Sequence, residues 1–252
     1  MKVVVIGGTG LIGSKVVAKL NAHGHEAIPA SPDSGVNTLT GEGLADVLVG
    51  ADVVVDVSNS PSFADDDVMS FFRTSTGNLL AAEQQAGVTH HVALSIVGSE
   101  RVPDSGYLRA KVAQEQLITE SGIPYSLVRA TQFFEFVGAI AQAATVDGVV
   151  HIAPVWFQPI AAEDVATFVA RTAAGEPLEG TVEVGGPERV RFDDFIREVL
   201  ADRGDVREVV TDSRARYFGA ELGDEDLVPG PGATLSQTTF ADWASTQVIA
   251  VQ

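Results

Sequence analysis

Tyr107 and Lys111, in the middle of the chain, carry side chains that together can deliver a proton. The segment Tyr107-Leu108-Arg109-Ala110-Lys111 places the phenol and the ammonium four residues apart, which is one face of a helix. A nearby positive charge stabilises a tyrosinate, so the tyrosine can protonate a carbonyl oxygen while a hydride arrives at the carbon. The pair therefore predicts acid catalysis in a carbonyl reduction.

A glycine-rich turn near the N-terminus is typical of a segment that holds a pyrophosphate. The residues Gly7-Gly8-Thr9-Gly10-Leu11-Ile12-Gly13 follow the aliphatic run Val3–Ile6 and open a helical stretch. Gly7 permits a tight turn, Gly10 lets the backbone approach the phosphates, and Gly13 allows close helix packing. Free N–H groups at the helix start then face the phosphates. We expect a dinucleotide cofactor to contact Gly7, Thr9, Gly10, Leu11, Ile12 and Gly13, with the Lys111 ammonium at its nicotinamide ribose.

The end of the second predicted strand bears on which dinucleotide is bound. An acidic residue at this position binds the adenosine ribose and favours NAD. Here the strand ends with Ala30-Ser31-Pro32, and Asp33 comes late. Ser31 can donate to a 2′-phosphate, and Lys15 can add positive charge. The sequence favours NADP, with NAD as the alternative.

Short aliphatic runs alternate with stretches of helical spacing along the chain. Predicted strands cover Val3–Ile6, His25–Ala30, Val36–Leu39, Asp52–Val57, Val92–Val97, Tyr125–Arg129 and Thr181–Val184. Predicted helices cover Leu11–His23, Leu44–Val49, Asp65–Ala86, Tyr107–Ser121, Asp164–Ala174 and Asp193–Asp202, and Phe240 and Trp243 mark a last one. Residues 219–231 are rich in Gly, Asp and Pro and predict a surface loop. The alternation predicts an α/β fold with a doubly wound parallel sheet and right-handed crossovers.

Composition excludes several classes of function. The net charge is -18 with only 16 Lys and Arg, and such a surface repels nucleic acid and anionic membranes. The absence of Cys removes disulfides and thiolate sites, and the five His show no ligand spacing, so we expect no metal. The chain shows neither a membrane-spanning run nor a signal peptide, so we expect a cytoplasmic protein without a membrane partner.

These motifs together resemble the short-chain dehydrogenase/reductase superfamily, and within it the atypical NmrA-like branch. The resemblance is carried by Gly7–Gly13, Asp52–Asn59, Leu94–Gly98, Tyr107–Lys111, Val128–Phe133 and Gln158–Ala166. It covers residues 1–170 well and the remainder loosely. It implies one NAD(P)-binding Rossmann domain over residues 1–252, with about seven strands and a small C-terminal region that covers the substrate. The substrate pocket would come mainly from residues 131–160 and 185–252.

The resemblance also implies roles for individual residues. Val57, Ser58 and Asn59 would line the adenine-ribose side of the cofactor, and Ala130, Thr131 and Phe133 would approach the nicotinamide. Ser95 would steady the substrate carbonyl, with Ser99 as the fallback, because many relatives carry a second Ser or Thr where Ile96 or Val97 stands. Phe133, Phe134 and Trp156 would line the substrate pocket with apolar surface.

The residues and the resemblance favour an NAD(P)H-dependent oxidoreductase that reduces a carbonyl or quinone-type small molecule. Tyr107 would supply the proton, and Lys111 and Ser95 would complete the catalytic set. Two alternatives stay open: a dinucleotide-binding redox sensor without turnover, whose relatives commonly lack the Tyr–Lys pair, and an epimerase or dehydratase of the same superfamily. A homodimer is expected only because dimers are the commonest assemblies.

Overall fold

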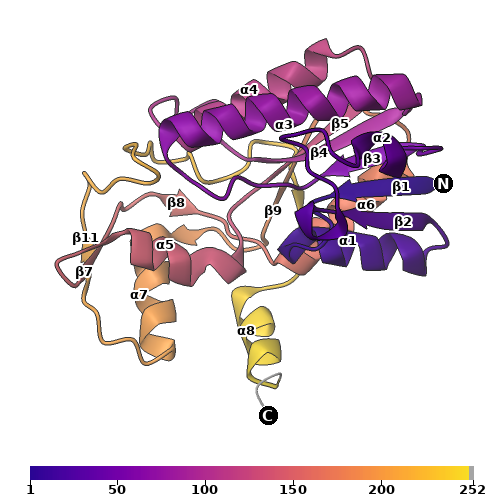
Figure 1. The fold of residues 1–252 in the computed structure, drawn as a ribbon. Helices are drawn as coiled ribbons and strands as arrows, with labels where there is room; N and C mark the ends of the chain where they lie inside the picture. Colours follow the sequence, from indigo (N-terminus) through magenta and orange to yellow (C-terminus); the bar gives the residue numbers. More distant parts are fainter. Residues whose placement is uncertain (250–252) are drawn as a thin grey trace.

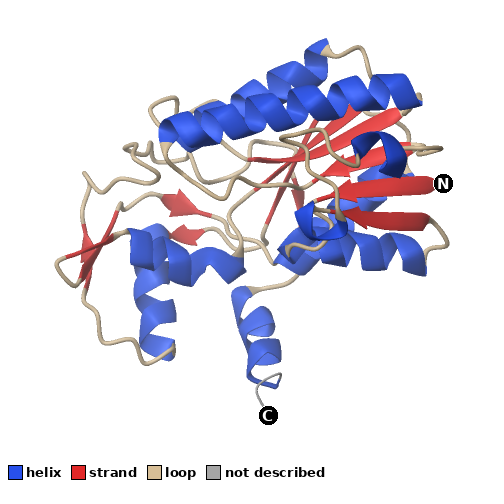
Figure 2. Ribbon diagram, in the orientation of Figure 1, coloured by secondary structure: helices blue, strands red, loops and turns tan. Residues whose placement is uncertain are grey.

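A seven-stranded parallel sheet forms the centre of the computed structural model, which describes residues 1–249 (Figures 1 and 2). Its order is β12-β9-β5-β4-β3-β1-β2, and every neighbouring pair is parallel. The strands are β1 (Lys2–Ile6), β2 (Glu26–Ala30), β3 (Val53–Asp56), β4 (His90–Ile96), β5 (Tyr125–Ala130), β9 (Gly180–Gly185) and β12 (Thr234–Leu235). Unbroken aliphatic runs form the central strands because both of their faces are buried; Val3, Val4 and Val5 are fully covered. The expected doubly wound fold is confirmed.

Helices cover both faces of this sheet. The long helices α3 (Asp65–Ala86) and α4 (Gly106–Glu120) lie side by side on one face, while α1 (Leu11–Ala22) and α6 (Ala162–Ala174) pair on the other (Figure 1). The short α2 (Leu44–Val47) packs near α3. Each helix buries one apolar stripe, such as Val16 and Leu20 of α1, which lie in the same core as β1.

A smaller region lies beside the sheet, on the side to which the arrows of β1 and β2 point (Figure 1). It contains the 3-10 turn Phe134–Phe136, α5 (Val137–Ala143), β6 (Thr145–Val146), β7 (Val149–Ile152), β8 (Trp156–Phe157), β10 (Val190–Arg191), α7 (Phe192–Asp202), β11 (Val209–Thr211) and α8 (Phe240–Ile249); another 3-10 turn, Pro32–Ser34, follows β2. We call it the cover. The cover has its own core, in which Phe157 stacks on Phe192 with ring centroids 4.4 Å apart. Phe240 and Trp243 pack against that core, as the sequence predicts.

The strand predicted over Val36–Leu39 is wrong. The chain is irregular at Val36, makes one bridge from Asn37 to Glu42, and then turns. The cause is the pair of glycines Gly41 and Gly43, with φ +80° and +72°, which close a tight loop that buries Val36 without extending it. No helix among residues 1–249 has the length and apolar character needed to cross a lipid bilayer.

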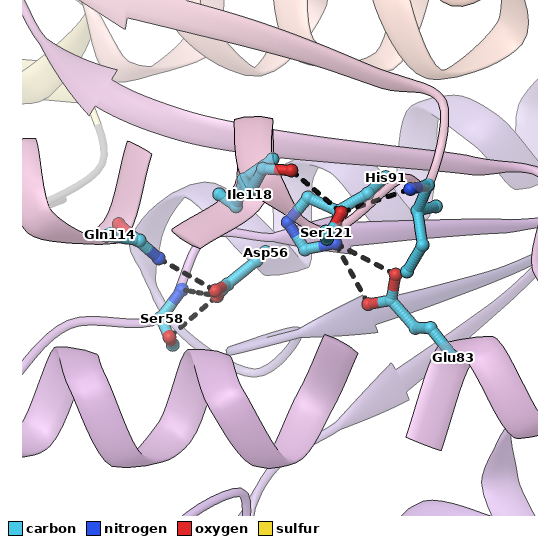
Figure 3. A network of polar contacts seen from close by, with 8 residues as sticks. Asp56, Ser58, Glu83, His91, Gln114, Ile118 and Ser121 are labelled. Carbon is cyan, nitrogen blue, oxygen red and sulfur yellow. Dashed lines mark hydrogen bonds and ion pairs between the residues drawn. The ribbon is translucent and has the colours of Figure 1, made fainter. Parts of the chain in front are cut away.

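Two adjacent histidines at the start of β4 serve packing. His91 Nδ1 lies 2.9 Å from Glu83 of α3, fully buried, and His90 on the other face contacts Ser126 Oγ at 2.8 Å (Figure 3 shows the His91–Glu83 pair). Burial by itself lowers the pKa of His91, but the Glu83 carboxylate raises it above its ordinary value. These contacts attach α3 and β5 to β4, whose carboxyl end reaches the site described next.

Candidate functional site

The glycine turn after β1 has no space for larger residues. Gly7 has φ +76°, and its N–H donates to the Ala30 carbonyl at 2.9 Å, which holds the turn against β2. A Cβ on Gly13 would lie 2.1 Å from the Gly7 carbonyl oxygen. Gly10 is the N-cap of α1 and offers no side-chain cap, so the first N–H groups of the helix are free to bind an anion. These features fit a pyrophosphate.

The loop after β3 lies directly against this turn. A Cβ on Gly7 would stand 3.0 Å from the Ser58 nitrogen, so the two segments expected to bind the cofactor touch. Buried Asp56 shapes the loop: it accepts from the Ser58 hydroxyl at 2.6 Å and from the Gln114 amide at 2.9 Å (Figure 3). Val57 and Ser58 are half-buried and Asn59 is exposed, which leaves this edge open to a ligand.

Tyr107 stands at the next position along the sheet edge. Ser105 caps α4, and its Oγ accepts from the Leu108 N–H, which fixes the helix start beside the ends of β3 and β4. The Tyr107 hydroxyl donates to Asn59 Oδ1 at 3.3 Å. Burial raises the pKa of Tyr107 to about 12, and the bond to Asn59 acts in the opposite direction. The phenol is therefore protonated at neutral pH and is available as a proton donor.

Lys111 lies one turn further along α4, beneath the site. Its ammonium donates to the Leu94 carbonyl at 2.9 Å and to the Gln114 side chain, and it sits 4.5 Å from the centroid of the Phe72 ring. Burial lowers the pKa of Lys111 to about 8, while Asp56 and Glu115 oppose the shift. The side chain is 4% exposed. In the described contacts the ammonium is thus held by Leu94, Gln114 and the Phe72 ring.

A cavity of about 620 Å³ lies where the carboxyl edge of the sheet meets the cover. Tyr107 and Asn59 line it from the sheet side. Its walls are mainly apolar and include Phe63, Ile96, Ala130, Phe133, Phe136, Ala139, Ile140, Ala143, Ala144, Ile152, Ala153, Phe192, Ala215, Phe218 and Leu222. A cavity of this size and character fits a small, largely apolar molecule.

Three buried polar side chains face this cavity from the ends of β4 and β5. Ser95 is 3%, Thr131 1% and Gln132 8% exposed, and no side-chain polar atom of the three makes a hydrogen bond of good geometry within residues 1–249. Buried polar groups normally have partners, so a ligand is the natural complement here. Ser99, the fallback for Ser95, is also buried and unpartnered within that range, but it does not line the cavity.

The structure moves two expected substrate residues away from the cavity. Phe134 is buried in the core of the cover against Phe240 and Trp243, because it follows Phe133 immediately and points the other way. Trp156 of β8 is covered by the guanidinium groups of Arg189 and Arg191, each within 5 Å of its ring. Of the three aromatic residues expected at the substrate, Phe133 alone lines the cavity.

Lys15 and Ser31, the two residues expected to favour NADP, are not both open to a ligand: Lys15 forms an ion pair, and Ser31 is buried. Lys15 pairs with Glu163 of α6 at 3.1 Å, so its charge is engaged away from the end of β2. Ser31 stands at that end, as expected, but is 6% exposed, and its N–H donates to Ser34 Oγ at 2.9 Å. The expected preference for NADP thus depends on the lack of a carboxylate at the tip of β2.

Four further residues of the cover line the cavity; they lie within the segments expected to form the pocket, but the sequence did not single them out individually. His151, Arg216, Tyr217 and Phe218 all line the cavity. His151 Nδ1 lies 3.3 Å from Asp212, and Arg216 lies 3.7 Å from Glu221, so each has an acidic neighbour. A Tyr-Phe-Gly sequence is a weak signal by itself, since the same residues occur in ordinary loops. Among the described residues, no group of three or more metal-binding side chains gathers at this or any other place.

Comparison with known proteins identifies the family. A model of an NAD(P)H-binding family matches residues 7–176, which include the glycine turn, Tyr107 and Lys111. The chain belongs to this NAD(P)H-binding family. The expected membership in the short-chain dehydrogenase/reductase superfamily, with its NAD(P) cofactor, is confirmed.

Two curated relatives of this chain are named as reductases. Divinyl chlorophyllide a 8-vinyl-reductase of Cucumis sativus is 30% identical, over 90% of this chain and 61% of that protein. A (4-alkanoyl-5-oxo-2,5-dihydrofuran-3-yl)methyl phosphate reductase of Streptomyces griseus is 29% identical, over 75% of this chain and 69% of that protein. The chain thus spans about two thirds of the length of these relatives.

A solved structure confirms the fold. The dTDP-4-dehydrorhamnose reductase of Bacillus anthracis, in complex with NADP, superposes with a TM-score of 0.70 over 98% of both chains. The identity is 14%, so this likeness concerns the fold alone. The cover and the sheet of this chain therefore follow an architecture common to reductases and epimerases of this fold.

Gly13→Ala is expected to lower the affinity for NADPH by about tenfold or more, because the added Cβ meets backbone that cannot move aside. Titration of NADPH fluorescence measures the effect. Gly77→Ala is the matched control: it lies within α3, and its Cβ would meet nothing within 4 Å. Equal affinities for the two variants would contradict a pyrophosphate at this turn.

Proposed function

We propose that the protein is an NAD(P)H-dependent oxidoreductase that reduces a carbonyl or quinone-type small molecule in the cavity. The observation that carries this proposal is the position of the Tyr107 hydroxyl. It lines the cavity, contacts Asn59 of the expected cofactor loop, and shares the cavity with the unpartnered Ser95 hydroxyl. The names of both curated relatives support a reductase.

Each residue of the site has a defined task in this proposal. The glycine turn and the loop Val57–Asn59 hold the dinucleotide, which when bound in its reduced form supplies the hydride. Ser95 donates a hydrogen bond to the substrate oxygen and orients it. Tyr107 gives its proton to that oxygen as the carbonyl carbon is reduced, and the resulting tyrosinate recovers a proton from solvent. The apolar walls exclude water from the reacting groups.

The buried charge of Lys111 favours the transient tyrosinate by Coulomb attraction. Because burial lowers the pKa of Lys111 to about 8, this charge disappears at moderately alkaline pH. Turnover is therefore expected to fall as the pH rises through about 8, and this fall should be absent in Lys111→Met, which is slow at every pH. Initial rates between pH 6 and 10 test the prediction, and an identical alkaline decline in both proteins would contradict it.

The lowered pKa of Lys111 also predicts that the stability of the fold increases with pH over the range in which turnover decreases. The folded-state pKa of Lys111 lies below its ordinary value of 10.5, so between about pH 8 and 10.5 the unfolded chain binds more protons. Lys111 thus costs stability below about pH 8, and this cost is relieved as the pH rises. Urea unfolding of the wild type relative to Lys111→Met should show the wild type gaining stability over this interval.

NADPH oxidation with a panel of quinones, diketones and simple ketones tests the proposed function. Absorbance at 340 nm follows oxidation, and fluorescence titration with NADPH and NADH measures binding in the same samples. Oxidation that depends on the second substrate supports the reductase. Tight cofactor binding without oxidation across the panel favours the sensor without turnover, and a lack of cofactor binding contradicts both. Tighter binding of NADPH than of NADH is expected from the missing carboxylate after β2.

A further inference from the structure

The cavity contains a second pair of polar side chains that the proposed chemistry does not use. Gln132 follows β5, and Tyr217 belongs to the cover; both line the cavity. The Gln132 amide is buried, lies beside the Tyr217 hydroxyl, and makes no hydrogen bond of good geometry within residues 1–249. An amide in this state has donors and an acceptor available to a ligand.

A strained turn holds Tyr217 in this position. Tyr217 and Ala220 exchange backbone hydrogen bonds of 2.8 and 3.1 Å across Phe218 and Gly219, which have φ +45° and +84°. Two positive φ values define a turn that prefers Asn-Gly, and a Phe at its first central position is strained. Such strain persists where the surroundings impose it and gathers at functional sites.

Aromatic rings beside Tyr107 surround Phe218 and hold it in its strained conformation. Phe218 lies 5.2 Å from Tyr107, 5.5 Å from Phe63 and 4.8 Å from Tyr217, measured between ring centroids. The Phe218 ring thereby joins the turn of the cover to the phenol on α4. Burial raises the pKa of Tyr217, and the nearby Tyr107 raises it further, while the side chain of Gln132 acts in the opposite direction; two protonated phenols thus share one apolar cavity.

We propose that Tyr217 and Gln132 bind a second oxygen of the substrate while Tyr107 and Ser95 bind the oxygen at the reacting carbon. The preferred substrate is then a planar apolar molecule with two oxygen functions, of the quinone or enedione class. The aromatic walls take the carbon skeleton, and each end of the molecule meets one phenol. This inference rests on the proposed function, because it assumes that the first oxygen is held by Tyr107.

Binding of two bicyclic probes to the full chain, saturated with NADP⁺, tests this assignment. 1,4-Naphthoquinone has the second oxygen and 1-tetralone lacks it, and the oxidised cofactor supplies no hydride, so calorimetry reads binding alone. The chain has no Cys, so no thiol is present that could react covalently with the quinone. Tyr217→Phe and Gln132→Leu are expected to weaken naphthoquinone binding about fivefold to tenfold and to change tetralone binding less than about twofold.

Tyr125→Phe is the matched control, since this tyrosine lies at the start of β5, outside the cavity. Equal losses for both probes would show that Tyr217 only shapes the cavity, and would overturn the proposal. So would unchanged naphthoquinone binding in both variants, or no naphthoquinone binding by the wild-type chain. Failure of the proposed function appears separately, as absence of NADPH oxidation over the whole panel.

Discussion

Tyr107→Phe is expected to lower kcat for NADPH oxidation by about 10²–10⁴-fold, the usual contribution of a positioned general acid. The substitution removes the proton donor and keeps the ring. The ring packs edge-on against Phe63 at 5.1 Å and against Phe218 at 5.2 Å, and these contacts survive in the variant. The lost hydroxyl makes one long hydrogen bond, of 3.3 Å to Asn59, so NADPH affinity should change by less than about threefold. Steady-state kinetics and a fluorescence titration of the same preparation measure the two quantities.

Asn59→Ala separates proton donation from the placement of Tyr107. It removes the acceptor of the hydroxyl and leaves the phenol in the cavity. We expect a kcat loss much smaller than that of Tyr107→Phe and a detectable loss of NADPH affinity, since Asn59 belongs to the expected cofactor loop. If Tyr107→Phe turned over at the wild-type rate, the proton would have to come from another group, and the proposed role of Tyr107 would be wrong.

The parts of the fold that the sequence predicts well are those that depend on local pattern. Strands β1, β3 and β4 are buried on both faces. Such burial requires aliphatic residues, and their runs can be recognised in the sequence. Helix α3 begins and ends at the predicted residues Asp65 and Ala86, because acidic residues open it and Gly87 closes it with φ +75°. The glycine turn is predictable from its spacing directly after an aliphatic strand, although the neighbours that exclude a Cβ at Gly7 come from the distant Ser58 loop.

The details of the site depend on contacts between distant segments, which local pattern does not contain. Phe133 and Phe134 differ by one position, and their chemistry is the same; only the direction of the chain after β5 places the first in the cavity and the second in the core. Lys111 is found by its spacing from Tyr107, but its burial depends on Leu94 and Gln114. Tyr217 enters the cavity through a turn of the cover that no periodicity predicts.

Arg129 shows how the site depends on a buried ion pair behind it. Arg129 lies near the end of β5, and its acidic partners are Glu115 of α4 and Glu100. Arg129 binds Glu115 through two hydrogen bonds of 2.9 and 2.6 Å, and Glu100 lies 2.8 Å away. The Arg129 side chain is 17% exposed and the Glu115 side chain 8%. The ion pair thus links β5, which leads to Thr131, with α4, which carries Tyr107.

Arg129→Met is therefore expected to lower the free energy of unfolding at pH 7 by about 3 kcal/mol, because the Glu115 carboxylate is left buried without its partner. Urea denaturation measures the loss. The double variant Arg129→Met/Glu115→Leu should recover much of it, since an apolar pair of similar size removes the stranded charge. Arg197→Met is the control: Arg197 pairs with Asp194 at 2.6 Å, but both side chains are largely exposed, so a loss of about 0.5 kcal/mol is expected.

Protonation provides an independent check on this interpretation. In Arg129→Met the buried Glu115 carboxylate loses its two hydrogen bonds to the guanidinium. The difference in stability between the wild type and Arg129→Met should then shrink as the pH falls from 7 to 4, since acid that neutralises the stranded carboxylate removes the cost of burying its charge. A difference that stays constant over this range would mean that Arg129 stabilises the fold through its packing, and that its charge contributes little to holding β5 and α4 together at the site.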